Sequence, residues 1–133
     1  MPVKSLLLVD DDKVSLLITK KLIQNYAPPT EFAEILIRDQ PSEGLMLVGE
    51  YLSKNQDFFI LLDINMPLIS GWDFLDRLKD IDPTERCQVI LLTSSVSELD
   101  KERALSYSSV RDFFSKPMDE ALVKRLLKHL GQV

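Results

Sequence analysis

Three unbroken apolar runs, each followed at once by polar residues, constrain the fold of this chain more than any other feature. They are Ser5 to Val9, Phe58 to Leu62 and Val89 to Leu92. A run that is apolar at every position must be covered on both faces, which is typical of the central strands of a parallel sheet. Two weaker runs, Phe32 to Ile37 and Val110 to Phe114, are interrupted by charged residues, as edge strands can be.

Apolar residues recur at helical spacing between these runs. The first helix is predicted over about 13–26, and four residues form its apolar face: Val14, Leu17, Ile18 and Leu22. Further helices are predicted after Pro41, after Gly71, over the weakly periodic segment 99–107 and over the leucine-rich segment 122–130. Strand and helix alternate about five times, which predicts a parallel sheet with helices on both faces.

The composition is that of one ordinary globular domain. The chain has 133 residues, of which 45% are hydrophobic and 28% charged, so one core can form without disulfides or metals as staples. No apolar run is long enough to span a membrane, and no signal peptide is recognisable. The single cysteine, Cys87, excludes an internal disulfide framework and suits a reducing cytoplasm. The net charge of −5 argues against a dedicated nucleic-acid binder. We therefore expect one cytoplasmic domain over residues 1–133, without membrane insertion and without room for an output domain.

Polar side chains follow four of the five predicted strands at the point where each strand ends. They are Asp10-Asp11-Asp12, Asp63, Thr93-Ser94 and Ser115-Lys116-Pro117. Ligands of open parallel α/β sheets bind at the carboxyl ends of the strands, so these side chains are expected to converge on one edge of the sheet.

Clustered carboxylates repel one another unless a cation lies among them. Because these motifs contain no His or Cys, they favour Mg²⁺ over zinc or copper. A carboxylate can attack phosphorus, while a lysine and a hydroxyl stabilise the phosphoryl oxygens, so the residue types suit phosphoryl transfer to aspartate. The chain has no glycine-rich phosphate loop, so a bound nucleotide donor is not expected.

Four stretches in this order carry a resemblance to a known family. They are Leu7-Leu8-Val9-Asp10-Asp11-Asp12, Leu62-Asp63-Ile64-Asn65-Met66-Pro67 with Gly71 following, Leu92-Thr93-Ser94, and Phe113-Phe114-Ser115-Lys116-Pro117. Together they resemble the receiver domain of two-component response regulators over essentially the whole chain. The resemblance implies a flavodoxin-like (βα)5 doubly wound parallel sheet with strand order 2-1-3-4-5. It also implies that a histidine kinase is the phosphodonor. Receivers of this family further catalyse their own phosphorylation from small donors and their own dephosphorylation.

The resemblance implies a role for each matching residue. Asp63 would be the phosphoacceptor, Lys116 the family's lysine and Thr93 the switch hydroxyl, with Phe113 as the switch aromatic. The metal ligands would be Asp10, Asp11, Asp63 and the backbone carbonyl of Asn65. Among them Asp11 would bind directly and Asp10 mainly through water.

The same resemblance places Asn65 and Ser95 at positions that tune the dephosphorylation rate in the family. Without an output domain, the signal would leave by protein contact on a surface formed by roughly 97–130.

Other interpretations stay open at this point. Asp12 fits a helix N-cap, Trp72 fits the core, and His129 fits a solvated residue near a helix C-terminus. The chain could instead be an intermediate phosphorelay carrier that passes its phosphoryl group to a histidine phosphotransfer protein. A phosphatase of the haloacid-dehalogenase type also places a nucleophilic Asp at a strand end, but it needs a second acidic residue two positions later, where this chain has Asn65.

Overall fold

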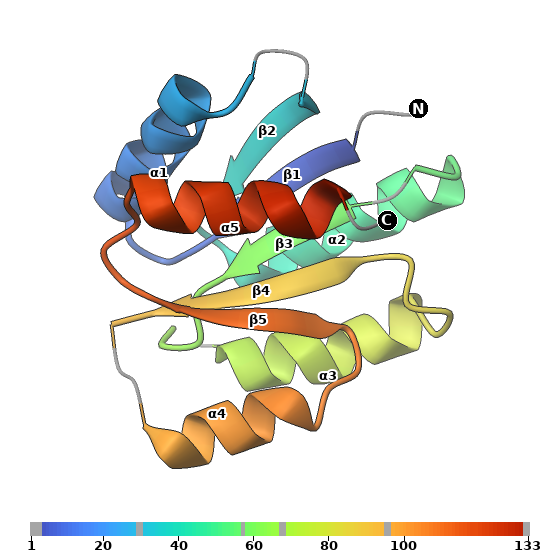
Figure 1. The fold of residues 1–133 in the computed structure, drawn as a ribbon. Coiled ribbons are helices and arrows are strands. Elements are labelled where there is room, and N and C mark those ends of the chain that lie inside the picture. The colour runs from blue at the N-terminus through green and yellow to red at the C-terminus, as the bar shows by residue number, and fades with distance from the viewer. Residues whose placement is uncertain (1–3, 29–30, 57, 67–68, 95–96, 132–133) are drawn as a thin grey trace.

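Five parallel strands form one sheet with helices on both of its faces (Figure 1). The computed structural model describes residues 4–28, 31–56, 58–66, 69–94 and 97–131. In chain order the elements are β1 (Lys4–Val9), α1 (Lys13–Tyr26), β2 (Phe32–Arg38), α2 (Pro41–Ser53), β3 (Phe58–Leu62), α3 (Gly71–Ile81), β4 (Gln88–Thr93), α4 (Glu98–Leu105), β5 (Val110–Ser115) and α5 (Glu120–Gly131). The strand order is β2-β1-β3-β4-β5, which confirms the flavodoxin-like topology and the assignment of the two interrupted runs to edge strands.

The side chains of the central strands alternate between two cores, one on each face of the sheet. Leu7, Ile60 and Leu91 pack on one face, mainly with residues of α2 and α3. Their neighbours Leu6 and Phe59 pack on the other face, with residues of α1 and α5. Because both faces are covered, β3 is buried at each of its positions, which accounts for its unbroken apolar sequence.

Three of the four residues predicted to form the apolar face of α1 are exposed, and only Leu22 packs against the core. Val14, Leu17 and Ile18 are 64, 58 and 57% exposed, whereas the buried positions of this helix are Leu16, Thr19 and Ile23. Both sets of residues recur at helical spacing, so periodicity alone does not select between them. The carboxylate of the N-cap residue at position 12 accepts hydrogen bonds from the first turn, so the capping prediction is correct.

Trp72 packs against the core, as the sequence predicted, whereas the prediction of a solvated His129 is wrong. Trp72 is half-buried between α3 and α4, where its ring stacks on Tyr107 at a centroid distance of 6.0 Å and lies 4.5 Å from the guanidinium of Arg103. His129 is paired rather than solvated, because its Nε2 lies 2.8 Å from Oδ2 of Asp112 on β5. Among the helices that the structure describes, none combines the length and apolar character needed to cross a bilayer.

Candidate functional site

The register of the sheet brings carboxylates together at its carboxyl edge. Val9 of β1 pairs with Leu62 of β3, so the next residue on each strand, Asp10 and Asp63, leaves the sheet at the same level. The backbone N–H of Asp63 donates to the carbonyl of Val9 at 3.0 Å, which holds the two strand ends together. Both residues are only 5–6% exposed despite their charge. The convergence expected at this edge is therefore present.

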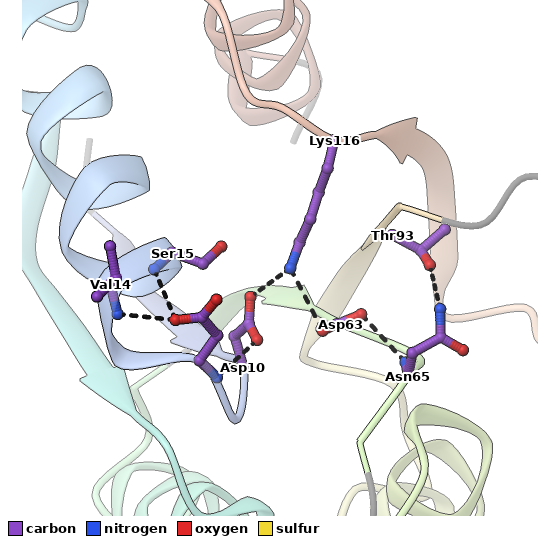
Figure 2. Close-up of polar contacts among 8 residues, drawn as sticks. Asp10, Val14, Ser15, Asp63, Asn65, Thr93 and Lys116 are labelled. Carbon is purple, nitrogen blue, oxygen red and sulfur yellow. Dashed lines mark hydrogen bonds and ion pairs between the residues drawn. The ribbon is translucent and has the colours of Figure 1, made fainter.

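Lys116 reaches these carboxylates from the far edge of the sheet. Its backbone N–H donates to the carbonyl of Thr93 at 2.8 Å, which fixes the chain where β5 ends beside β4. From there its Nζ lies 2.6 Å from Oδ2 of Asp10 and 3.4 Å from Oδ2 of Asp63 (Figure 2). The lysine therefore balances the charge of Asp10 better than that of Asp63.

The ionisation of the two carboxylates follows this unequal pairing. Burial raises the pKa of Asp63 to about 6, and the nearby charge of Asp10 adds to the rise, against the hydrogen bond from the backbone N–H of Asn65. Burial also acts on Asp10, but the hydrogen bonds from Lys116 and from the N–H of Asp12 hold the pKa of Asp10 below its usual value. Conversely, burial opposes the charge on Lys116, yet the two carboxylates raise the pKa of its ammonium.

A third carboxylate completes a possible cation site. One oxygen each from Asp10, Asp11 and Asp63 lie within 4.8 Å of one another, and Asp11 is the exposed member. Burial and the charge of Asp10 raise the pKa of Asp11, against the charge of the Lys116 ammonium, which lowers it. An all-oxygen, negatively charged donor set suits a hard divalent cation such as Mg²⁺. These residues therefore fit the metal that the sequence predicted.

Asn65 links Asp63 to Thr93. Its backbone N–H donates to Oδ1 of Asp63 at 3.1 Å, and its side-chain amide Nδ2 donates to Oγ1 of Thr93 at 2.8 Å (Figure 2). Thr93 is fully buried, whereas Asn65 is exposed. The sequence predicts a metal-binding role for the backbone carbonyl of Asn65, but it does not predict this side-chain contact. Its only sequence signal is that both residues lie at or just past the ends of adjacent strands.

Phe113 lies apart from the carboxylate cluster. It is a half-buried residue of β5, pairs with Leu91 of β4 and packs against the core on the α3 side of the sheet. The carboxylate of the preceding residue, Asp112, accepts hydrogen bonds from the guanidinium of Arg125 at 2.5 and 2.6 Å. The switch role of Phe113 stays a prediction. Ser95 lies outside the described residues.

A comparison with family models matches residues 6–128 to the response regulator receiver domain. The transcriptional regulatory protein CpxR of Klebsiella pneumoniae is 31% identical over 122 residues, which are 91% of this chain and 47% of that protein. The probable transcriptional regulator ycf29 of Porphyra purpurea is 31% identical over 127 residues, which are 95% of this chain and 56% of that protein. The chain thus spans about half the length of these curated relatives.

Solved structures show the same fold. A two-component response regulator from Cytophaga hutchinsonii superposes with a TM-score of 0.87 at 25% identity, and the match covers 100% of both chains. The receiver domain of the histidine kinase CKI1 from Arabidopsis thaliana, complexed with Mg²⁺ and BeF3⁻, superposes with a TM-score of 0.75 at 17% identity. That match covers 98% of this chain and 91% of the other.

Proposed function

This chain belongs to the response regulator receiver family of two-component signalling, and we propose that Asp63 accepts a phosphoryl group from a histidine kinase in the presence of Mg²⁺. The observation that carries the proposal is the convergence of Asp10, Asp11 and Asp63 with the ammonium of Lys116 at one edge of the sheet. This arrangement combines a nucleophile, a cation site and a fixed positive charge.

The reaction is a displacement at phosphorus by a carboxylate oxygen of Asp63. A bond forms between that oxygen and phosphorus while the phosphorus–nitrogen bond of the phosphohistidine breaks, and its electron pair stays on the imidazole nitrogen. The raised pKa of about 6 leaves Asp63 mostly ionised at neutral pH, and it makes the oxygen more basic than that of an exposed aspartate. The ammonium of Lys116, 3.4 Å from Oδ2 of Asp63, is placed to stabilise the negative charge of the transferring group.

The remaining residues hold the phosphoryl group and the metal. A Mg²⁺ ion bound by Asp10, Asp11, Asp63 and the backbone carbonyl of Asn65 would supply positive charge to the phosphoryl oxygens. The receiver domain of CKI1 was crystallised with this metal, which agrees with the carboxylate cluster found here. The hydroxyl of Thr93 donates a hydrogen bond to one phosphoryl oxygen.

The output is proposed to be a protein contact on the surface formed by α4, β5 and α5, biased by Thr93 and Phe113. Two large apolar side chains of α4, Leu99 and Leu105, are 77 and 82% exposed, and they support this choice. Transfer of the phosphoryl group to a histidine phosphotransfer protein is the alternative output. Timed transfer from the labelled chain separates the two. The stand-alone arrangement stays a prediction, which the mass of the native gene product tests.

Labelling by acetyl phosphate tests the phosphorylation step. We expect the native chain to gain one phosphoryl group by intact mass when Mg²⁺ is present, and to gain none when a chelator removes the metal. Asp63→Asn should abolish the gain. Asp80→Asn removes the same charge from an exposed position of α3, so this control should leave labelling intact. Undiminished labelling of Asp63→Asn would refute the assignment.

A further inference from the structure

The side chain of Asn65 contacts the site in a way that its proposed backbone role does not use. Its amide nitrogen donates to Oγ1 of Thr93 at 2.8 Å, across 28 residues of sequence and from one strand end to the next. The same residue donates its backbone N–H to Oδ1 of Asp63. One exposed residue therefore holds both the nucleophile and the switch hydroxyl (Figure 2).

The direction of the hydrogen bond matters. A hydroxyl group has one proton to donate and two lone pairs to accept with, whereas an amide nitrogen only donates. In the contact between Asn65 and Thr93, the threonine oxygen therefore acts as acceptor. This contact does not consume the hydroxyl proton, which is the group that a phosphoryl oxygen on Asp63 requires. Accepting one hydrogen bond also strengthens a hydroxyl as donor of the next one.

We propose that Asn65 is a positioning residue, whose side chain orients the Thr93 hydroxyl to donate its proton to the transferring phosphoryl group. This inference rests on the proposed function. Thr93 is fully buried at the end of β4. A small rotation of its side chain would change the direction in which its hydroxyl proton points. Asn65 restricts that rotation from the loop that follows Asp63. The amide thus couples the phosphorylated loop to the end of β4.

A double-mutant cycle tests this coupling. The variants are Asn65→Ala in three backgrounds: native, Thr93→Ser, which keeps the hydroxyl, and Thr93→Val, which keeps the shape but removes the oxygen. The measurement is the rate constant of labelling by acetyl phosphate with Mg²⁺. In this reaction the carboxylate of Asp63 forms a bond to phosphorus, while the phosphorus–oxygen bond to acetate breaks and acetate leaves with the electron pair.

We expect Asn65→Ala to slow labelling about fivefold in the native and Thr93→Ser backgrounds, the factor that corresponds to a net hydrogen bond of about 1 kcal/mol. In the Thr93→Val background the effect should fall below about twofold, because the partner oxygen is gone. An equal slowing in all three backgrounds, or no slowing in the native one, would overturn the proposal. Because Asn65 is exposed, thermal melts should show each Asn65→Ala protein to be as stable as its parent.

A second measurement needs no phosphorylation. In the ¹⁵N-labelled unphosphorylated chain, the side-chain amide signals of Asn65 should shift on Thr93→Val and should stay close to their native positions on Thr93→Ser. Unmoved signals in Thr93→Val would also overturn the proposal. A native chain that takes no label would overturn the proposed function and this role with it, whereas a labelled chain with equal effects would overturn the role of Asn65 alone.

Discussion

At the scale of single residues, the site is governed by one ammonium shared among carboxylates. The Nζ of Lys116 lies 0.8 Å closer to Asp10 than to Asp63, at 2.6 against 3.4 Å. Asp63 is therefore the less compensated of the two buried carboxylates, in line with its raised pKa. Because of this inequality the proposed nucleophile stays basic, and a further positive charge such as a metal ion would stabilise its ionised form.

Gly71 fixes the loop that follows the proposed nucleophile. A Cβ atom at this position would lie 2.6 Å from Cα of Ile64 and 3.0 Å from the carbonyl oxygen of Asp63. Both are backbone atoms, so the clash can be relieved only if the loop backbone shifts. We expect Gly71→Ala to lower the free energy of unfolding by on the order of 3 kcal/mol and to slow labelling by acetyl phosphate. Urea denaturation followed by the fluorescence of Trp72, the sole tryptophan, measures the first effect.

Gly49 supplies the matched control within α2. Apart from its chain neighbours and the backbone of its own helix, no described atom lies within 4 Å of a Cβ placed there, so the alanine meets open space. Gly49→Ala should raise the free energy of unfolding by about 0.5–1 kcal/mol, because glycine loses more backbone entropy than alanine in a helix. Similar effects of the two substitutions would contradict the close approach at Gly71.

At the scale of the elements, α1 shows how a helix can carry two apolar stripes and bury only one. Leu16 and Ile23 lie seven positions apart and pack into the core shared with α5. Leu17 and Ile18 follow Leu16 directly in sequence and point away from the sheet. The rotation of the helix is set by its attachment to β1 through a short capped turn, and that geometry depends on the assembled sheet rather than on the helix sequence.

The two stripes of α1 should respond differently to truncation. Leu16→Ala removes a side chain that is 3% exposed and leaves a cavity, so it should cost about 2–4 kcal/mol of unfolding free energy. Leu17→Ala removes a side chain that is 58% exposed, so its cost should stay within about 0.5 kcal/mol. Urea denaturation compares both variants with the native chain. A larger loss in Leu17→Ala than in Leu16→Ala would restore the face predicted from periodicity.

The joint between β5 and α5 is a second feature that the sequence did not indicate. Asp112 is partly buried, which alone would raise its pKa, but hydrogen bonds from His129, from the N–H of Phe113 and from Arg125 lower the pKa of Asp112 overall. The side-chain partners of this carboxylate, Arg125 and His129, lie 13 and 17 residues later, on a different element. A sequence shows the charges but not which face of α5 turns toward β5, so it does not predict the pairing of His129 with Asp112.

At the scale of the whole molecule, the fold and the convergence of the site were predictable for one shared reason. Apolar runs ended by polar residues specify buried parallel strands, and parallel strands place their carboxyl ends on one edge. Asp10, Asp63 and Lys116 therefore meet whatever the details of packing. The contact of Asn65 with Thr93 and the unequal distances to Lys116 were not predictable, because they depend on side-chain rotamers and on fractions of an ångström between strand ends.

The stability of the whole domain should depend on pH through Asp63. Its pKa is about 6 in the folded chain and near 4 in the unfolded chain, so between about pH 4 and pH 6 the folded state binds more protons. The contribution of this group to the unfolding free energy is therefore fully present below about pH 4 and is lost as the pH rises through about 6. Asp63→Asn removes the ionisation, so in metal-free buffer near neutral pH it should be more stable than the native chain by about 3 kcal/mol. The difference should vanish at about pH 4.

Urea denaturation across this pH range measures the effect, with the exposed Asp80→Asn as the control for loss of one negative charge. That control should differ little from the native chain at any pH, because its charge is screened by solvent. Millimolar Mg²⁺ should stabilise the native chain more than Asp63→Asn, since a cation that binds only the folded state raises the unfolding free energy. A native chain that equals Asp63→Asn in stability at neutral pH without metal would show that the carboxylate cluster carries no uncompensated charge.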